Sequence, residues 1–454
     1  MVFRTPNFPI RPNSGVNETG PPKVRQRIAC LKKAVGNLGL LLAAMGILGG
    51  VLEAGLAMTR INTKAYLRFI PDKGTTFIPK AYYRFTKEGF SEGYFNSHGF
   101  RDYERTYEKA AGTFRILIFG DSYVEASQVA LSDAFPALLE KRLNAHSTAT
   151  KFEVLNLGQG GFGTVDEYMR YMNFGVKYSP DLVILAFLTG NDFLDNSKFL
   201  SQESHGFYFV FDNNNLVLDR SVIDKYQGSL TLSKRLFQAL KQKSYLANLI
   251  SERFYLLREE IRTNRFKKHV AADRPEGVER KLDEFSVLNI YLPELSMPWR
   301  EAVDLTKGVI LKFRDAVEEH SARFVLVTLS NAEQVHPHMQ QALHNTYGLP
   351  FDYSKPDRML EEFARQSRIP MLQLMPMFLE YHLKTGKYLH GFGSSDGGHW
   401  NENGHCLAAE KIFAFLQEKG LVSADSTTGR AHTQACGTSD SRTARERAAR
   451  AGRP

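Results

Sequence analysis

The most constraining feature of this sequence is an alternation of short apolar runs with amphipathic helical stretches. Apolar runs of β-forming residues span 114–119, 152–157 and 181–188, and each ends in residues that favour a turn. Between them, residues 135–143 and 165–172 place apolar side chains at helical spacing. Apolar strands separated by helices are typical of a parallel sheet covered on both faces. The sequence therefore predicts an α/β fold, a three-layer α/β/α sandwich on a mostly parallel sheet.

The first apolar run ends at Gly120-Asp121-Ser122, which places a serine directly after a strand. Ligands of open α/β sheets bind at the carboxyl ends of the strands. Ser122 is therefore a candidate catalytic residue. Serine is also a favoured helix N-cap, so Ser122 taken alone fits a structural role equally well.

Composition describes an ordinary globular chain with additions at both ends. The 454 residues are 43% hydrophobic and 24% charged, which is enough for one domain of roughly 250 to 300 residues plus appendages. The net charge of +9 is concentrated in residues 4–33 and 442–453. These basic ends lack interleaved aromatic residues and carry no known nucleic-acid motif, so we predict no nucleic-acid partner.

An uncharged stretch near the N-terminus predicts a membrane anchor. Residues 34–52 contain no charged side chain, and 19 residues suffice to cross a bilayer core as a helix. Because a basic cluster precedes this stretch, we expect a transmembrane anchor over 34–58, a cytoplasmic N-terminus, and the rest of the chain outside the cytoplasm, in the periplasm. A signal peptide cleaved near Gly55-Leu56-Ala57 is the alternative.

The remaining segments have distinct patterns. Residues 1–33 are basic and expected to lack stable structure, 59–110 predict a β-rich lead-in, and 111–421 predict the main domain. A helical insertion over 193–297 follows the third apolar run. Its position fits a lid or substrate platform and fits equally well a helical subdomain with no role at the site. Residues 422–454 lose their apolar side chains and predict a disordered basic tail.

Cysteine and histidine patterns indicate no metal site. The three cysteines, Cys30, Cys406 and Cys436, are scattered and predict neither a disulfide framework nor a zinc site. His336 and His338 have no carboxylate or thiol at matching spacing, so a loop pair is the better interpretation. We therefore expect no metal and no cofactor.

Four short motifs, in order, resemble those of the SGNH hydrolase family, also called GDSL esterases and lipases. They are Gly120-Asp121-Ser122, the N-x-x-x-x-G pattern from Asn156 to Gly161, Thr189-Gly190-Asn191-Asp192, and Asp396-Gly397-Gly398-His399. The third motif is normally G-x-N-D and here begins with threonine. The resemblance covers about 114–421. It implies a flavodoxin-like sandwich in a membrane-anchored, bacterial-type member of the family.

The resemblance also implies roles for particular residues. Ser122 would be the nucleophile, His399 its base and Asp396 the carboxylate that orients the imidazole. The N–H groups of Ser122 and Gly161 and the side-chain amide of Asn191 would form the oxyanion hole. The chemistry agrees, because a serine hydroxyl needs an adjacent base to act as a nucleophile at neutral pH. His405, early in the final helix, is expected to be a capping or packing residue.

The expected activity is hydrolysis of a carboxylic ester, on a small molecule or a glycan, through an acyl-enzyme on Ser122. Family members also include acyltransferases that acetylate extracellular polysaccharides with the same triad, which is one alternative. A non-catalytic glycan-binding relative is a second alternative. The presence of every catalytic residue type argues against it.

Overall fold

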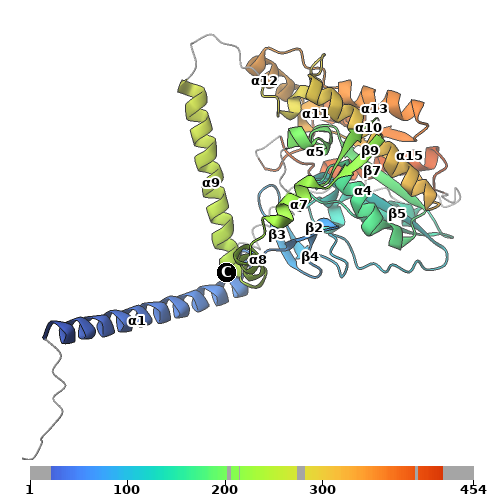
Figure 1. The fold of residues 1–454 in the computed structure, drawn as a ribbon. Coiled ribbons are helices and arrows are strands. Elements are labelled where there is room, and N and C mark those ends of the chain that lie inside the picture. Colours follow the sequence, from blue (N-terminus) through green and yellow to red (C-terminus); the bar gives the residue numbers. More distant parts are fainter. Residues whose placement is uncertain (1–21, 202–205, 214, 273–281, 394–396, 423–454) are drawn as a thin grey trace, which may run out of the picture. The chain divides into compact units, whose positions relative to one another are not determined.

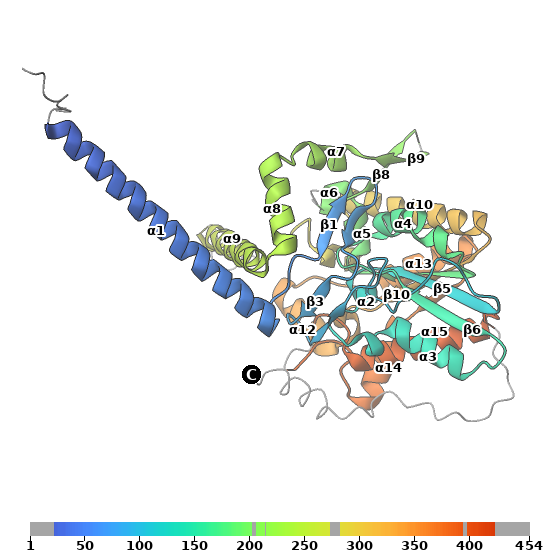
Figure 2. The ribbon, with the colours of Figure 1, turned by 90° about the horizontal axis from the view of Figure 1, so that it is seen from below.

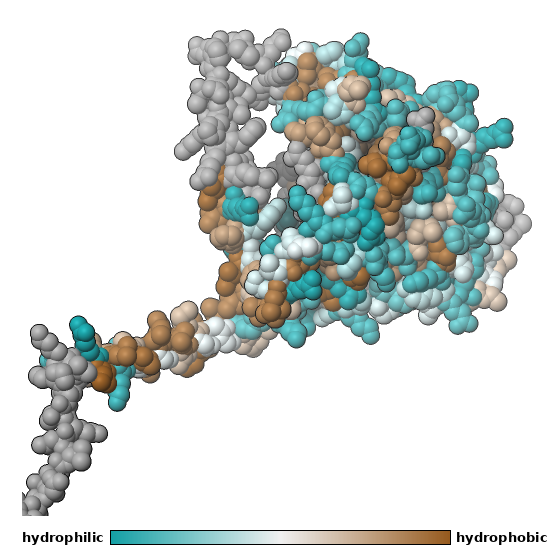
Figure 3. Space-filling model, viewed as in Figure 1, coloured by the Kyte–Doolittle hydropathy of each residue, from teal (hydrophilic) through white to brown (hydrophobic). Residues whose placement is uncertain are grey.

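The computed structural model describes residues 22–201, 206–213, 215–272, 282–393 and 397–422 of the chain. They fall into two compact units that divide after Arg60. The first unit is the single helix α1 (Pro22–Thr59). Its span Gln26–Thr59 contains an 18-residue stretch with a mean hydropathy of 2.0, and it is long and apolar enough to cross a membrane or to act as a signal sequence. Its apolar side chains are seen in Figure 3.

Helix α1 is longer than the sequence predicted. The expectation that 1–33 lacks stable structure is wrong for residues 22–33, which belong to α1. A helix nucleated in the apolar stretch extends at little cost into a polar flank, and this explains the difference. The predicted anchor, 34–58, lies within α1. Residues 1–21 and all but the first residue of the predicted tail 422–454 lie outside the described residues.

The second unit is built on a five-stranded sheet in the spatial order β11-β10-β7-β5-β6. Every neighbouring pair in it is parallel. This is the doubly wound, flavodoxin-like order, and it confirms the predicted fold class. The strands are β5 (Thr113–Gly120), β6 (Lys151–Asn156), β7 (Leu182–Leu188), β10 (Arg323–Leu329) and β11 (Met371–Gln373).

Helices cover both faces of this sheet (Figure 2). One face packs on α3 (Phe135–Ala145), α14 (Met375–Thr385) and α15 (Glu402–Glu418), and the other on α4 (Thr164–Asn173), α10 (Met297–Glu319) and α13 (Lys355–Gln366). Alternate residues of β5 enter the two cores: Ile116 and Ile118 face the first, Leu117 and Phe119 the second. Both faces of the strand are therefore apolar, as its sequence requires.

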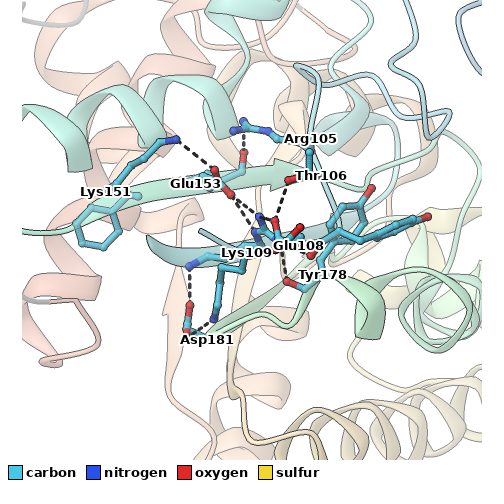
Figure 4. A network of polar contacts seen from close by, with 12 residues as sticks. Arg105, Thr106, Glu108, Lys109, Lys151, Glu153, Tyr178 and Asp181 are labelled. Carbon is cyan, nitrogen blue, oxygen red and sulfur yellow. Dashed lines mark hydrogen bonds and ion pairs between the residues drawn. The ribbon is translucent and has the colours of Figure 1, made fainter. Parts of the chain in front are cut away.

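A β-rich lead-in precedes the sheet. It contains two antiparallel hairpins, β1 (Leu67–Ile70) with β2 (Gly74–Phe77) and β3 (Tyr82–Phe85) with β4 (Ser91–Tyr94). The link from β4 to β5 is fixed to the sheet by polar contacts (Figure 4). Lys109 pairs with Asp181 at 2.8 Å, and the same carboxylate accepts the N–H of Arg115 at 2.7 Å.

The insertion after β7 is mostly helical. It contains α5 (Asp192–Asn196), α6 (Lys198–Ser201), α7 (Ser221–Gly228), α8 (Leu232–Lys243), α9 (Tyr245–Ala272) and the 3-10 turn η3 (Val287–Tyr291), and also a hairpin of β8 (Tyr208–Asp212) and β9 (Asn215–Asp219). The junction of α8 and α9 is tied to the lead-in, since Asn248 Nδ2 donates to the carbonyl of Thr63 at 2.9 Å. Figure 1 shows α7 and α8 following one another, with α9 continuing from α8.

Short elements complete the domain. They are α2 (Ser122–Glu125), α11 (Ala332–Val335), α12 (Pro337–Tyr347) and the 3-10 turns η1 (Leu131–Asp133) and η2 (Gly175–Tyr178). Cys406 on α15 is disulfide-bonded, whereas Cys30 on α1 is free. The sequence predicted no disulfide framework, and it gave no sign of this single bond at Cys406. Spacing along a chain does not reveal which thiols the fold brings together.

Candidate active site

The candidate site lies at the switch point of the sheet, between β5 and β7. Gly120, the last residue of β5, pairs with Ala186 of β7. Ser122 begins α2 directly after β5, and Asn191 is the N-cap residue of α5 after β7. Both motif residues therefore flank the crevice in which doubly wound sheets bind their ligands.

The turn that presents Ser122 is capped by the residue before it. Asp121 is the N-cap of α2, and its Oδ1 accepts the N–H of Tyr123 at 2.9 Å. Burial raises the pKa of this carboxyl to about 6. A Cβ on Gly120 would lie 2.2 Å from Val124 Cγ2, so this position requires glycine. Asp121 takes the capping role, and the interpretation of Ser122 as a mere N-cap is wrong.

Ser122 is hydrogen-bonded to a histidine from the other end of the chain. Its Oγ lies 2.8 Å from Nε2 of His399, and Nδ1 of His399 lies 2.7 Å from Oε2 of Glu88. The His399 side chain is 25% exposed, so a substrate can approach from solvent. A hydroxyl, an imidazole and a carboxylate in this sequence of contacts can activate a serine nucleophile.

The segment that carries His399 is held by its backbone. The carbonyl of His399 accepts the N–H of Gly391 at 2.9 Å, and the N–H of Asn401 donates to Leu389 at 3.0 Å. The hydroxyl of Tyr123 donates to the carbonyl of Gly398 at 3.1 Å. The residue after the nucleophile thus also supports the residue before the base, which fixes the distance between the two.

The structure brings together two of the three predicted triad residues. Ser122 and His399 are in contact, whereas Asp396 lies outside the described residues. Glu88 was missed by the sequence analysis. It sits in the turn between β3 and β4, 311 residues from His399, and no motif surrounds it. A glutamate in a hairpin turn is usually exposed to solvent, so the sequence alone could not predict that Glu88 contacts His399.

The loop after β6 passes beside the nucleophile. A Cβ on Gly160 would lie 3.4 Å from Cβ of Ser122, and the Gly160 N–H donates to Oε2 of Glu125 at 2.6 Å. Gly161, the predicted oxyanion-hole residue, has a φ of +77°, which favours glycine. In the part of the chain that the structure describes, its N–H has no protein acceptor. Asn156 fixes this loop by donating from Nδ2 to the carbonyl of Val124 at 2.7 Å.

The turn that carries Asn191 is braced on both sides. Oδ2 of Asp192 accepts the N–H of Leu188 at 2.8 Å and closes the turn after β7. Thr189, which replaces the usual first glycine of the motif, donates from Oγ1 to Oε1 of Gln334 at 3.1 Å. The threonine thus links this turn to α11 and leaves Asn191 at the start of α5.

Other histidines have structural positions. His405 is 1% exposed and accepts the N–H of Phe135 at 3.4 Å. Burial lowers its pKa to about 3, so it is a neutral packing residue, as expected. His336 is the N-cap residue of α12 and His338 lies in that helix, so the pair does not form a loop. Among the described residues there is no group of three side chains suited to hold a metal ion.

Comparisons with known proteins give only distant likenesses. No protein-family profile matches the chain, and no curated protein matches it. Among solved structures it is similar to the acetyl xylan esterase AlAXEase at 15% identity and a TM-score of 0.34, over 66% of this chain and 98% of that one. It is also similar to TesA at 14% identity and a TM-score of 0.32, over 67% of this chain and 98% of that one. A mutant of Axe2, an acetyl-xylooligosaccharide esterase from Geobacillus Stearmophilus, is 15% identical with a TM-score of 0.35, over 69% of this chain and 97% of that one. Because the identities and TM-scores are this low, these likenesses do not establish the activity, which depends on the geometry of the site.

Proposed function

We propose that this chain is a serine esterase of SGNH type that hydrolyses a carboxylic ester. The observation that carries the proposal is the hydrogen bond of 2.8 Å between Ser122 Oγ and His399 Nε2 at the switch point of the sheet. A hydroxyl bonded to an imidazole nitrogen is an activated nucleophile, and a partly exposed imidazole leaves room for a substrate.

In the first half of the reaction, Ser122 Oγ attacks the ester carbonyl carbon while His399 Nε2 takes the hydroxyl proton. The carbonyl oxygen becomes an oxyanion, which would receive hydrogen bonds from the N–H groups of Ser122 and Gly161 and from the Asn191 amide. Each such donor contributes about 3 to 4 kcal/mol to transition-state stabilisation in comparable enzymes. The imidazolium then gives its proton to the departing alcohol, and the acyl group stays on Ser122.

In the second half, a water molecule attacks the acyl carbon. His399 Nε2 takes the water proton and returns it to Ser122 Oγ as the carboxylic acid leaves. In an acyltransferase, a sugar hydroxyl would take the place of this water. The same side chains serve both reactions, so the acceptor decides between them.

Product analysis tests the proposal. The full chain in detergent would be incubated with p-nitrophenyl esters of short and long acyl chains, with and without soluble polysaccharide. We expect free carboxylic acid to form at the same rate in both cases. Acyl-polysaccharide forming faster than free acid would contradict the hydrolase assignment. Glycan binding without any turnover would contradict enzymatic activity altogether.

We further propose that α1 is an uncleaved single-pass anchor that leaves the N-terminus in the cytoplasm and the catalytic domain in the periplasm. Basic residues cluster over 23–33, at the N-terminal end of the apolar span, in the pattern of a cytoplasmic flank. The disulfide at Cys406 supports the same orientation, because disulfides persist in oxidising compartments.

A thiol count checks this orientation. The chain has three cysteines, of which Cys30 is free and Cys406 is disulfide-bonded. We expect Cys30 to react with a thiol reagent in denatured protein purified from an exporting host before any reduction, and Cys406 to react only after reduction. Reaction of Cys406 before reduction would contradict the disulfide and remove this support for export.

A further inference from the structure

The turn between β3 and β4, residues 86–90, brings a carboxylate to the candidate catalytic histidine. Oε2 of Glu88 lies 2.7 Å from Nδ1 of His399 and also accepts the backbone N–H of His399 at 3.2 Å. One carboxylate oxygen thus contacts both the ring nitrogen and the backbone N–H of His399. Two contacts of this kind fix the rotation of the imidazole as well as its position.

This turn is attached to the segment that follows the nucleophile helix. The N–H of Phe90 donates to the carbonyl of Gln128 at 3.2 Å, and the hydroxyl of Ser91 donates to the carbonyl of Ser127 at 2.5 Å. Because residues 127 and 128 follow α2 almost directly, these contacts hold the turn at a set distance from Ser122.

A buried arginine strengthens the attachment. Arg101, 1% exposed, donates to the carbonyls of Glu125 at 2.9 Å and Val129 at 2.5 Å. Its Nε donates to the hydroxyl of Tyr83 on β3 at 3.0 Å. The guanidinium therefore joins the hairpin that carries Glu88 to both ends of the segment that follows α2.

Two glycines allow the close approach. Gly89 has a φ of +60°, and a Cβ there would lie 2.3 Å from the carbonyl oxygen of Gln128. Gly398 has a φ of +93°, and a Cβ there would lie 2.9 Å from Oε1 of Glu88. A side chain at position 89 would push the turn away from Gln128, and one at position 398 would displace the carboxylate of Glu88. The contact between Glu88 and His399 thus depends on glycines at 89 and 398 and on the hydrogen bonds that hold the turn in place.

We propose that Glu88 is the positioning residue for His399 in the reaction. The proposal rests on the esterase function above. The carboxylate accepts a hydrogen bond from the Nδ1–H of His399 and so selects the tautomer in which Nε2 can accept the proton of Ser122. It also stabilises the imidazolium that forms during the attack. The lead-in, which contributes no residue to the family motifs, thereby supplies part of the catalytic machinery.

The test replaces Glu88 by glutamine in the full chain. We expect kcat to fall about 10²- to 10³-fold with KM nearly unchanged, less than the loss of about 10⁴ seen for a fully buried triad carboxylate. A smaller loss is expected because the Glu88 side chain is 39% exposed.

The matched control is Glu92→Gln on the same hairpin. Glu92 accepts from Arg84 at 3.0 Å and from the hydroxyl of Tyr82 at 2.7 Å, away from His399. We expect this variant to keep kcat within about twofold of the parent, because surface substitutions of this kind change the stability of a protein little.

A fluorophosphonate probe gives a second readout that needs no knowledge of the natural ester. The labelling rate of Ser122 should fall in Glu88→Gln in parallel with kcat, and it should be unchanged in Glu92→Gln. A Glu88→Gln protein that reacts with ester and probe within about threefold of the parent, while Asp396→Asn does not, would overturn the proposal. A parent that is labelled but hydrolyses no ester would contradict only the proposed substrate class.

Discussion

Replacing Ser122 by alanine is expected to lower kcat for ester hydrolysis by about 10⁵- to 10⁶-fold, the scale of loss found when a serine nucleophile is removed. In the proposed mechanism the Ser122 hydroxyl forms the acyl-enzyme, and alanine leaves the turn intact because Asp121 caps α2 without it. Steady-state rates on a p-nitrophenyl ester, with circular dichroism as a check of folding, measure the effect.

The matched control is Ser132→Ala in η1, where the side chain is exposed, and we expect it to behave as the parent. His399→Ala should cost nearly as much as Ser122→Ala, and the double variant should cost no more than either, because the two residues act as one unit. A Ser122→Ala protein that keeps a hundredth or more of the parental kcat would show that another group is the nucleophile.

Replacing Arg115 by methionine is expected to lower the free energy of unfolding by about 3 to 5 kcal/mol, the usual cost of breaking a buried ion pair. Arg115 is 1% exposed and lies 2.7 Å from Glu153, and it also donates to the carbonyl of Tyr178 at 2.7 Å. Figure 4 shows the network to which these two partners belong. Although burial opposes it, the hydrogen bond from Arg115 holds the pKa of Glu153 below its usual value. The substitution leaves that carboxylate without its main partner.

Urea unfolding of the full chain in detergent measures this change. Lys151→Met is the control, because Lys151 approaches the same carboxylate at 3.4 Å but is 68% exposed. An exposed pair of this kind contributes about 0 to 1 kcal/mol. A loss below about 1 kcal/mol in Arg115→Met would contradict the structural role given to this pair.

The sheet could be predicted from the sequence because its strands are buried on both faces. An apolar run such as 181–188 has no other simple explanation between two helical stretches, and β7 covers Leu182–Leu188. The same argument placed Ser122 and Asn191, because motif residues that follow parallel strands meet at one edge of the sheet. The predicted order of strands and helices therefore indicated where in the fold the motif residues would lie, at the carboxyl ends of the strands.

Contacts between distant segments could not be predicted in this way. Glu88 reaches His399 because the hairpin turn that carries it is hydrogen-bonded to the loop after α2. The residues next to Glu88 in the sequence indicate an ordinary turn. The disulfide at Cys406 and the helical residues 22–33 were missed for related reasons. The disulfide depends on which residues the fold places side by side, and the helical residues 22–33 depend on how far α1 extends beyond its apolar part.

Trapping the acyl-enzyme tests the central claim most directly. The parent protein would be mixed with a short-chain p-nitrophenyl ester, quenched in acid within the first turnovers, and digested for mass spectrometry. We predict an acyl group on the peptide that contains Ser122, present in the parent and absent from Ser122→Ala. Rapid release of p-nitrophenol by the parent with the acyl group on another side chain, and equal release by Ser122→Ala, would contradict the account.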